Sequence, residues 1–360
     1  MKEAAFMVVV GADVHKRTHT FVGVDEAARE LGHKTFPATT EGHQAAVRWA
    51  RATFGRDLHW AVEDCRHLSA RLERDLLTDG QAVVRVPPKM MAEQRRIART
   101  RGKSDPIDAA AVARAALREP DLPVASHDDV SRELKLLVDR REDLVTTRTA
   151  TINRLLWRVH ELDPSWAPPA KSLDLTKHQQ ALKARLDSVV EDGVVGLVAE
   201  LAAAELAEII ELTAKINTLA KRIERRVDEA APTLLAMPGV GPLTAAKIVG
   251  EAAGVGRFKS EAAFARHSGI APIPVWSGNT AGRVRLTRSG NRQLNAAIHR
   301  IAITQIRLDG LGQAYYRKKK AEGMSNSEAL RCLKRRLVRV VYGHLHTDQD
   351  AARPRLLAAA

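Results

Sequence analysis

The sequence predicts a mixed α/β domain at the amino terminus, followed by two regions made of helices. The first 120 residues alternate short, β-branched apolar runs with helical patterns. Beyond them, apolar residues recur three and four positions apart over long stretches, which is typical of amphipathic helices. A chain of 360 residues also exceeds what one hydrophobic core usually supports. We predict domains over residues 1–120, 121–230 and 231–347, and a frayed tail at 348–360.

The amino-terminal region reads as three neighbouring strands followed by alternating helices and strands. Apolar, β-branched runs predict strands at Phe6–Ala12, Thr18–Val24, Lys34–Phe36, Leu58–Val62 and Gln81–Val86. Helical spacing predicts helices at Gly42–Thr53, His67–Leu77, Lys89–Arg101 and Asp105–Leu117. Three meandering strands followed by helix, strand, helix, strand and helix form the pattern of the ribonuclease-H-like fold.

Carboxylates follow two of these strands and open one of the helices. Asp13 ends the first strand, and Glu63 and Asp64 end the fourth. Asp105 and Asp108 lie three residues apart, so both can project from the same side of a first helical turn. The carboxyl ends of strands in α/β sheets commonly hold ligands. Converging acids repel one another, and bound Mg²⁺ or Mn²⁺ relieves that repulsion and suits phosphodiester chemistry.

A plainer interpretation fits each acid singly. Asp105 suits a helix N-cap, Pro106 the first helical position, and Asp108 the positive end of the helix dipole. Asp13 and Glu63 can be solvated loop residues. His15 and His67 lie near these acids and can support them, although surface positions suit both as well.

Charge and composition point to a polyanionic partner. Lys and Arg outnumber Asp and Glu 57 to 43, which gives a net charge of +14 and a pI near 10.1. Nucleic acid is the commonest partner of such a chain. Cys65 and Cys332 are the only cysteines, which excludes a disulfide framework and suits a reducing compartment. No run approaches the roughly 18 apolar residues of a membrane span, so we expect a soluble, cytoplasmic protein without a membrane partner.

The middle region predicts long helices with basic faces. Ser131–His160 carries an apolar helical stripe, and Arg140 and Arg148 lie among the cations on its other faces. Phosphate contact and a merely solvated face remain open for these arginines. Further on, a heptad pattern predicts a coiled coil, carried by Ile209, Leu212, Ile216, Leu219 and Ile223. Its partner can be a helix of the same chain or of a second subunit, and we expect both.

The carboxy-terminal region contains two glycine-rich turns. Gly239 and Gly241 precede an Ala-rich helix, which predicts a helix-hairpin-helix element whose backbone amides approach a phosphate. An ordinary turn between packed helices is the alternative. Ser277 lies in a second loop and is a candidate nucleophile, although a loop serine is usually only a hydrogen-bonding turn residue. Polar side chains downstream can stabilise charge or bind phosphate: Arg283, Arg285, Arg288 and Asn291.

The last helical segment is strongly basic. Tyr315 and Tyr316 precede a run of cations, and further arginines recur between Arg331 and Arg339. The cations can follow a nucleic-acid backbone while the tyrosines stack on bases or pack. A solubilising face is the plainer interpretation.

Together these segments resemble the DEDD-type transposases of bacterial insertion sequences. That family is also called the bridge-RNA-guided recombinases, and it is related to the pilin-gene invertase. The resemblance covers nearly the whole chain and rests on seven short segments: Gly11–Lys16, Ala61–Asp64, Lys103–Ala109, Pro238–Pro242, Gly269–Pro272, Ser277–Gly278 and Gly290–Asn291.

The resemblance implies a catalytic domain of the RuvC type that uses Mg²⁺ or Mn²⁺. The implied metal ligands are Asp13, Glu63, Asp105 and Asp108, and the implied nucleophile is Ser277, which attacks a DNA phosphodiester and becomes joined to it. The implied partners are donor and target DNA, a noncoding guide RNA and further copies of the chain, in a dimer or tetramer. The implied location is the bacterial cytoplasm, in association with the nucleoid.

One segment departs from the family pattern. Many relatives follow the strand-end Glu with a small residue and Gly, whereas this chain has Glu63-Asp64-Cys65-Arg66. Asp64 is therefore an alternative ligand to Glu63. Two other functions stay open, a metal-dependent nuclease or junction resolvase that uses water and a nucleic-acid-binding protein without catalysis.

Overall fold

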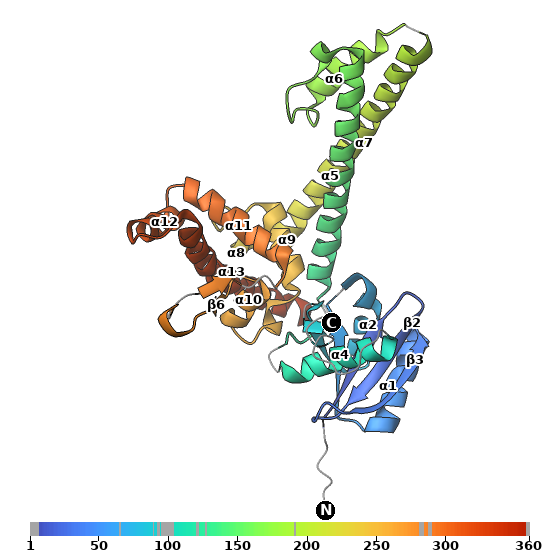
Figure 1. The fold of residues 1–360 in the computed structure, drawn as a ribbon, viewed down its shortest axis with the longest axis vertical. Coiled ribbons are helices and arrows are strands. Elements are labelled where there is room, and N and C mark those ends of the chain that lie inside the picture. Colours follow the sequence, from blue (N-terminus) through green and yellow to red (C-terminus); the bar gives the residue numbers. More distant parts are fainter. Residues whose placement is uncertain are drawn as a thin grey trace, which may run out of the picture. The chain divides into compact units, whose positions relative to one another are not determined.

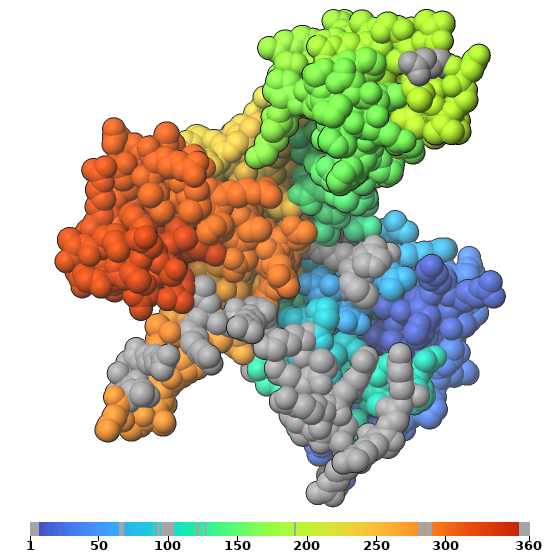
Figure 2. All heavy atoms as spheres, turned by 45° about the horizontal axis from the view of Figure 1, so that its top comes forward, coloured from blue at the N-terminus to red at the C-terminus, as the bar shows by residue number. Residues whose placement is uncertain are grey.

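A computed structural model describes most of the chain. The described residues are 7–64, 66–88, 90–91, 94, 104–119, 122–126, 128–190, 192–280, 284–286 and 290–357. The remaining residues are grey in Figures 1 and 2. The chain divides into two compact units, one formed by Met1–Asp129 with Ala252–Ala360 and the other by Val130–Glu251.

A five-stranded mixed sheet forms the amino-terminal part of the first unit (Figure 1). Its order is β3-β2-β1-β4-β5, with strands at β1 Val8–Val14, β2 Thr18–Val24, β3 Glu30–Pro37, β4 Leu58–Glu63 and β5 Ala82–Val86. β2 is antiparallel to both β1 and β3, whereas β4 is parallel to both β1 and β5. The predicted mixed α/β pattern, a meander continued by two further strands, is therefore confirmed.

Helices cover both faces of this sheet because side chains alternate along the strands. On one face, Val10 and Ala12 pack with α1 (Thr40–Phe54) and α2 (Arg66–Thr78). On the other face, Val9 packs with the alanines of α4 (Asp105–Arg118). Strand β1 is thus buried on both sides, as its continuous apolar run predicts.

Gly11 allows α4 to lie directly on β1. A Cβ atom at this position would be 2.1 Å from the carbonyl oxygen of Ala109 and 2.6 Å from the backbone nitrogen of Ala113. Neither backbone atom can move away cheaply, so only glycine fits. This close approach sets the first turn of α4 beside the carboxyl end of β1.

Two sequence interpretations in this part are wrong. β3 begins at Glu30 and not at Lys34, because it pairs only with β2 and its solvent-facing residues are polar, which hides the strand pattern. Asp105 is not the N-cap of α4; Ser104 has the extended backbone of that position, and Asp105 is already helical. The helix predicted at Lys89–Arg101 lies mostly outside the described residues.

The second unit is built on two long helices. Its elements are α5 Asp129–Leu162, η1 Pro164–Trp166, α6 Thr176–Asp187, α7 Gly193–Ala230, α8 Pro232–Leu235 and α9 Pro242–Ala252. α5 and α7 run antiparallel, since Arg226 bonds Glu133 at 2.8 Å near one end and Arg158 bonds Glu205 at 3.1 Å near the other.

The isoleucines of the predicted seam on α7 are buried, whereas its leucines are not. Ile209, Ile216 and Ile223 are almost fully buried, and Leu212 and Leu219 are half-buried. Thr213, next to Leu212, is buried and accepts a hydrogen bond from Arg148 of α5. At the far end, Leu155 of α5, Leu182 of α6 and Leu206 of α7 join one core. A coiled coil with a second subunit stays a prediction.

The carboxy-terminal part contains a small hairpin and four helices. Its elements are η2 Val255–Arg257, α10 Glu261–His267, β6 Pro272–Pro274, η3 Gly278–Thr280, β7 Val284–Leu286, α11 Arg292–Arg307, α12 Leu311–Ala321 and α13 Asn326–Leu357. Strands β6 and β7 have three residues each, too short for a periodic pattern in the sequence.

The frayed tail predicted at 348–360 is wrong for its first ten residues. α13 continues through Leu357, and the side chain of Asp348 is buried within it. Composition alone marks this stretch as a polar terminus, because the burial of Asp348 has no signal in the local sequence.

Candidate active site

The sheet register brings two acids to the same edge and the same face. Ala12 of β1 pairs with Val62 of the parallel strand β4, so Asp13 and Glu63 are the next residues along neighbouring strands. Because Ala12 and Val62 face the α1 and α2 side, Asp13 and Glu63 face the side that α4 covers. The first turn of α4 carries Asp105 and Asp108.

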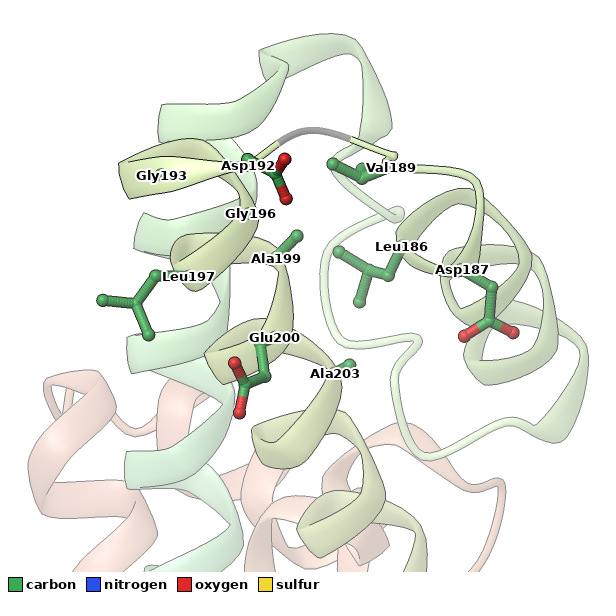
Figure 3. A pocket seen from close by; sticks show the side chains of 10 residues that line it. All are labelled: Leu186, Asp187, Val189, Asp192, Gly193, Gly196, Leu197, Ala199, Glu200 and Ala203. Atoms are coloured by element: carbon green, nitrogen blue, oxygen red, sulfur yellow. The ribbon is translucent and has the colours of Figure 1, made fainter.

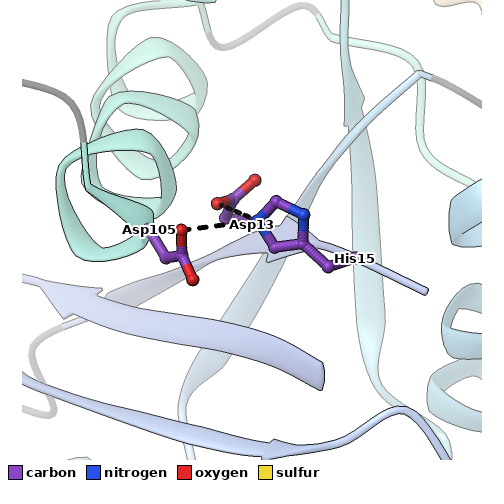
Figure 4. A group of neighbouring side chains, drawn as sticks. All are labelled: Asp13, His15 and Asp105. Carbon is purple, nitrogen blue, oxygen red and sulfur yellow. Dashed lines mark hydrogen bonds and ion pairs between the residues drawn. The ribbon is translucent and has the colours of Figure 1, made fainter. Parts of the chain in front are cut away.

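Asp13, Asp105 and His15 form the tightest group at this edge (Figure 4). His15 Nε2 lies 3.0 Å from Asp13 Oδ2 and 3.5 Å from Asp105 Oδ1. One donor atom from each of the three residues lies within 4.8 Å of the others. Asp13 is mostly buried, whereas about half of the His15 and Asp105 side chains is exposed, so the group opens to solvent.

The surroundings of Asp13 disfavour the charged form of its carboxyl group. Burial raises the pKa of Asp13 above its ordinary value, the nearby His15 lowers it, and the carboxylates of Asp108 and Asp105 raise it again. Asp108 is itself 6% exposed. Negative charge is therefore concentrated beside Asp13, and a bound cation would relieve it.

The donor set fits a divalent metal ion. Carboxylate oxygens suit Mg²⁺ and Mn²⁺, and Mn²⁺ also accepts an imidazole nitrogen such as that of His15. Glu63 and Asp108 lie outside the group with donor atoms within 4.8 Å, although register and charge place both nearby. Asp64 continues the β4 edge by donating its backbone N–H to Val86 at 2.9 Å.

His15 belongs to the acidic group itself, whereas its sequence position predicts only a supporting neighbour of the acids. The spacing Asp-x-His was the available signal, because residues two apart on an extended chain project to the same face.

Ser277 lies in the connection between β6 and β7. Pro272 of β6 is paired with Leu286 of β7, and the Ser277 side chain is exposed in the loop between the strands. Gly278, which follows it, has φ +49°, a backbone conformation that favours glycine. The loop therefore presents the serine hydroxyl on the surface of a short hairpin.

Two glycines in close contact form the base of this hairpin. Gly269 and Gly290 have φ +66° and +115°, and a Cβ atom on Gly290 would lie 2.5 Å from the backbone nitrogen of Gly269. Asn295 of α11 donates to the carbonyl oxygens of Ser268 and Gly269 at 3.0 and 3.2 Å. The buried Lys334 of α13 donates to Asn295 Oδ1 at 2.6 Å. The hairpin is thus anchored at its base although its loop is exposed.

The residues predicted to contact nucleic acid fall in varied settings. Gly239 has φ +83° in the turn between α8 and α9, and a Cβ on Gly241 would meet open space. Arg140 is exposed on α5, whereas Arg148 is half-buried and donates to Thr213 Oγ1 at 3.1 Å. Asn291 caps α11 by accepting the N–H of Leu294 at 2.9 Å.

Three of the arginines predicted to contact nucleic acid lie wholly or partly outside the described residues. Arg283 and Arg288 lie outside the described residues, and for Arg285 the structure describes only the backbone, in β7. Nucleic-acid contact stays a prediction for every residue in this set.

A hollow of about 500 Å³ lies where α6 leads into α7, and its lining does not suit nucleic-acid binding (Figure 3). Its charged side chains are acidic, Asp187, Asp192 and Glu200, and the others include Leu186 and Leu197. Such a lining repels phosphate.

Among the described helices, none is long and apolar enough to cross a membrane.

Comparisons with known proteins show which families and chains this sequence is similar to. Residues 10–162 match a family model described as a transposase, and residues 231–317 match one described as a transposase of the IS116/IS110/IS902 family. The uncharacterized 42 kDa protein of insertion element IS900 from Mycobacterium paratuberculosis is 27% identical, covering 98% of this chain and 99% of its own. The uncharacterized 44.8 kDa protein of insertion element IS116 from Streptomyces clavuligerus is 26% identical, covering 93% and 94%.

A solved structure, T. thermophilus RuvC in complex with Holliday junction substrate, matches 32% of this chain and 98% of its own at 15% identity. Its TM-score of 0.26 is below the range of a shared fold, so the fold assignment rests on the sheet topology. The two family models together span the acidic group and the serine hairpin, and the insertion-element relatives match nearly end to end. The chain therefore belongs to the IS110/IS116 family of DEDD transposases, which are DNA-processing enzymes of insertion elements.

Proposed function

We propose that this transposase is a site-specific recombinase that cuts and rejoins DNA through a covalent phosphoserine at Ser277. The observation that carries the proposal is the meeting of Asp13, His15 and Asp105 at the edge of the sheet. A transposase with an acidic, metal-fitting group and a separately anchored, exposed serine has both parts that this chemistry needs.

The acidic group has the task of holding positive charge at the scissile phosphate. Asp13, Glu63, Asp105 and Asp108 would bind the metal, with His15 as a further donor. Mg²⁺ or Mn²⁺ bound there would supply positive charge for the attacking and leaving oxygens of an in-line displacement. The half-exposed side chains of His15 and Asp105 leave this group open to a DNA backbone.

Ser277 would act as the nucleophile. Its Oγ forms a bond to phosphorus while the bond from phosphorus to the leaving deoxyribose oxygen breaks; the serine proton passes to a base, and the leaving oxygen gains a proton. Rejoining reverses this exchange with the hydroxyl of a different strand, so the phosphodiester is conserved without another energy source.

Strand exchange requires several cut ends to be held at once. We therefore propose that the chain acts as a dimer or tetramer with donor and target DNA. A noncoding guide RNA would select the two sites by base pairing, while the protein recognises backbone and shape. The net charge of +14 supports a protein that holds several nucleic-acid strands.

A denaturing gel of labelled element-end DNA tests the proposal. Wild-type protein with Mg²⁺ and RNA transcribed from the element's flanks should give a protein–DNA adduct that chelation abolishes. Ser277→Ala and Asp105→Asn should both lose the adduct. Ser188→Ala and Asp174→Asn are matched controls at exposed positions in the second unit, and both should keep it.

The controls separate the alternatives. Cleavage without an adduct, undiminished in Ser277→Ala, would show a nuclease or resolvase that uses water. Specific binding that is unchanged in Asp105→Asn, with no cleavage by any variant, would show a nucleic-acid-binding protein without catalysis.

A further inference from the structure

A basic groove is lined by the carboxy-terminal helices, and Ser277 is not among its lining residues. It has a volume of about 600 Å³. α13 contributes most of its lining, because Cys332, Arg335, Arg336 and Arg339 recur three and four residues apart on one helix face. α12 contributes Tyr315.

An acid from α10 holds two of these arginines in place. Glu261 accepts an ion pair from Arg335, and its other oxygen lies 3.6 Å from Nε of Arg339. About a third of the Arg335 side chain and three quarters of that of Arg339 stay exposed. Because one carboxylate faces two guanidinium groups, the lining keeps positive charge while the arginines are already oriented.

The third arginine stacks on an aromatic ring. The Arg336 guanidinium carbon lies 5.0 Å from the centre of the Tyr315 ring, and Lys319 Nζ lies 5.7 Å from the same centre. Among the residues that the structure describes, Arg336 has no ion-pair partner. Its exposed, planar guanidinium can therefore take a phosphate or extend the stack to a further flat group.

These features differ from those of a merely solubilising face. Such a face needs neither an aromatic ring under a guanidinium nor an acid that orients two further arginines. A phosphate next to a flat ring is the chemistry of an unpaired nucleotide, in which the base stacks while the backbone contacts arginine. The bases of a duplex are stacked on each other and offer no free face to Tyr315.

We propose that this groove binds an unpaired nucleotide segment, with its base stacked at the Tyr315–Arg336 pair and its phosphates at Arg335 and Arg339. The proposal rests on the proposed function only in that recombination leaves strands unpaired; RNA and DNA share this chemistry. The buried Lys334 on the same helix points to Asn295 and takes no part.

Cys332 supplies a direct readout because it lines the groove and is partly exposed. The rate of its alkylation by iodoacetamide, followed by mass spectrometry of the full-length protein, should fall at least fivefold when a 16-nucleotide single strand saturates the protein. The same sequence as a duplex, at equal phosphate concentration, should leave the rate within twofold of the free protein. DNA and RNA strands are tested separately, and the tighter one identifies the natural source.

Substitutions in the groove sharpen the test. Tyr315→Leu and Arg336→Gln should each weaken single-strand binding by roughly 5- to 150-fold, the range of one lost base stack, and should remove the protection of Cys332. Tyr315→Trp should bind as well as wild type, which shows that a ring is needed and guards against misfolding as the cause. Arg317→Gln removes the same charge from an exposed position of α12 outside the groove and should change affinity less than threefold.

Three results would overturn the proposal: full alkylation of Cys332 at saturating single strand, equal protection by the duplex, or equal loss of affinity in Arg317→Gln and Arg336→Gln. Binding is measured without metal and with Ser277→Ala protein as well, so a failure of the serine mechanism leaves this test intact.

Discussion

In the proposed mechanism, the acidic group and the serine hairpin each place a reactive side chain, and the structure supports the two placements in opposite ways. Asp13 and Glu63 end strands that are hydrogen-bonded on both sides, and α4 is pressed against Gly11 beneath them. Ser277 lies in an exposed loop between strands of three residues, and the fixed part is the glycine contact at its base. A rigid acidic group suits metal binding, whereas an anchored but exposed loop suits a nucleophile that must meet different strands in turn.

Gly11→Ala should disrupt the acidic group. The added methyl group overlaps the backbone of α4, so we expect a loss of unfolding free energy of about 3 kcal/mol or more and a loss of Mn²⁺ binding. Chemical denaturation and isothermal titration calorimetry measure the two effects. Gly32→Ala is the control, because its Cβ would lie 3.8 Å from the nearest atom. Unchanged Mn²⁺ affinity in folded Gly11→Ala would disprove the role of this contact.

Acid should weaken the sheet domain through His19. Burial lowers the pKa of His19 to about 4 from 6.5, with the stacked His43 as the second cause. The unfolded chain therefore binds a proton below pH 6.5 that the folded chain refuses until about pH 4. Stability is fully present above pH 6.5 and falls by about 3 kcal/mol as the pH drops to 4.

Urea unfolding of the protein, followed by tryptophan fluorescence, to which the buried Trp60 of the sheet contributes, measures this dependence across the range from pH 7 to 4. His19→Asn should flatten the profile, and His33→Asn, at an exposed position, should not. A slope that persists unchanged in His19→Asn would assign the acid sensitivity to other groups.

Divalent metal should stabilise the sheet domain and leave the hairpin unaffected. At a hundred times its dissociation constant, Mn²⁺ should add about 2.7 kcal/mol to the unfolding free energy. Asp13→Asn should remove that gain, whereas Ser277→Ala should keep it. Thermal melting with and without Mn²⁺ decides; an equal gain in Asp13→Asn would place the metal elsewhere.

Gly290→Ala should disrupt the base of the serine hairpin. A side chain at φ +115°, 2.5 Å from Gly269, costs roughly 1–3 kcal/mol and shifts the base of the hairpin. We expect at least tenfold slower adduct formation with Mn²⁺ affinity unchanged. Gly343→Ala in α13, where a Cβ meets open space, should instead stabilise the protein by about 0.5–1 kcal/mol. Wild-type adduct rates in Gly290→Ala would refute the anchoring role.

The sheet and its acids were predictable because both follow from short-range patterns. Buried strands read as apolar runs, and strand register then brings Asp13 and Glu63 to one edge. β3 was predicted too short because an edge strand carries polar residues, and the end of α13 was missed because the burial of Asp348 depends on packing that no local pattern signals.

The candidate site was predictable only in part. Its acids could be named from strand ends and the first turn of a helix, but the membership of His15 depends on side-chain geometry. The contact between Gly269 and Gly290 joins residues 21 positions apart, and no local pattern signals it. The pairing of Arg336 with Tyr315 likewise depends on how α12 packs against α13.

The pairing of α5 with α7 sets the length of the second unit and the direction in which its tip points. With 38 residues, α7 extends about 57 Å, close to the rise of 17 base pairs of duplex DNA. Adding seven residues to both helices would keep the buried seam and lengthen the pair by about 10 Å. Adding three or four to each would turn its tip to a different side. Only insertions of whole heptads should therefore keep both the buried seam and the orientation of the tip.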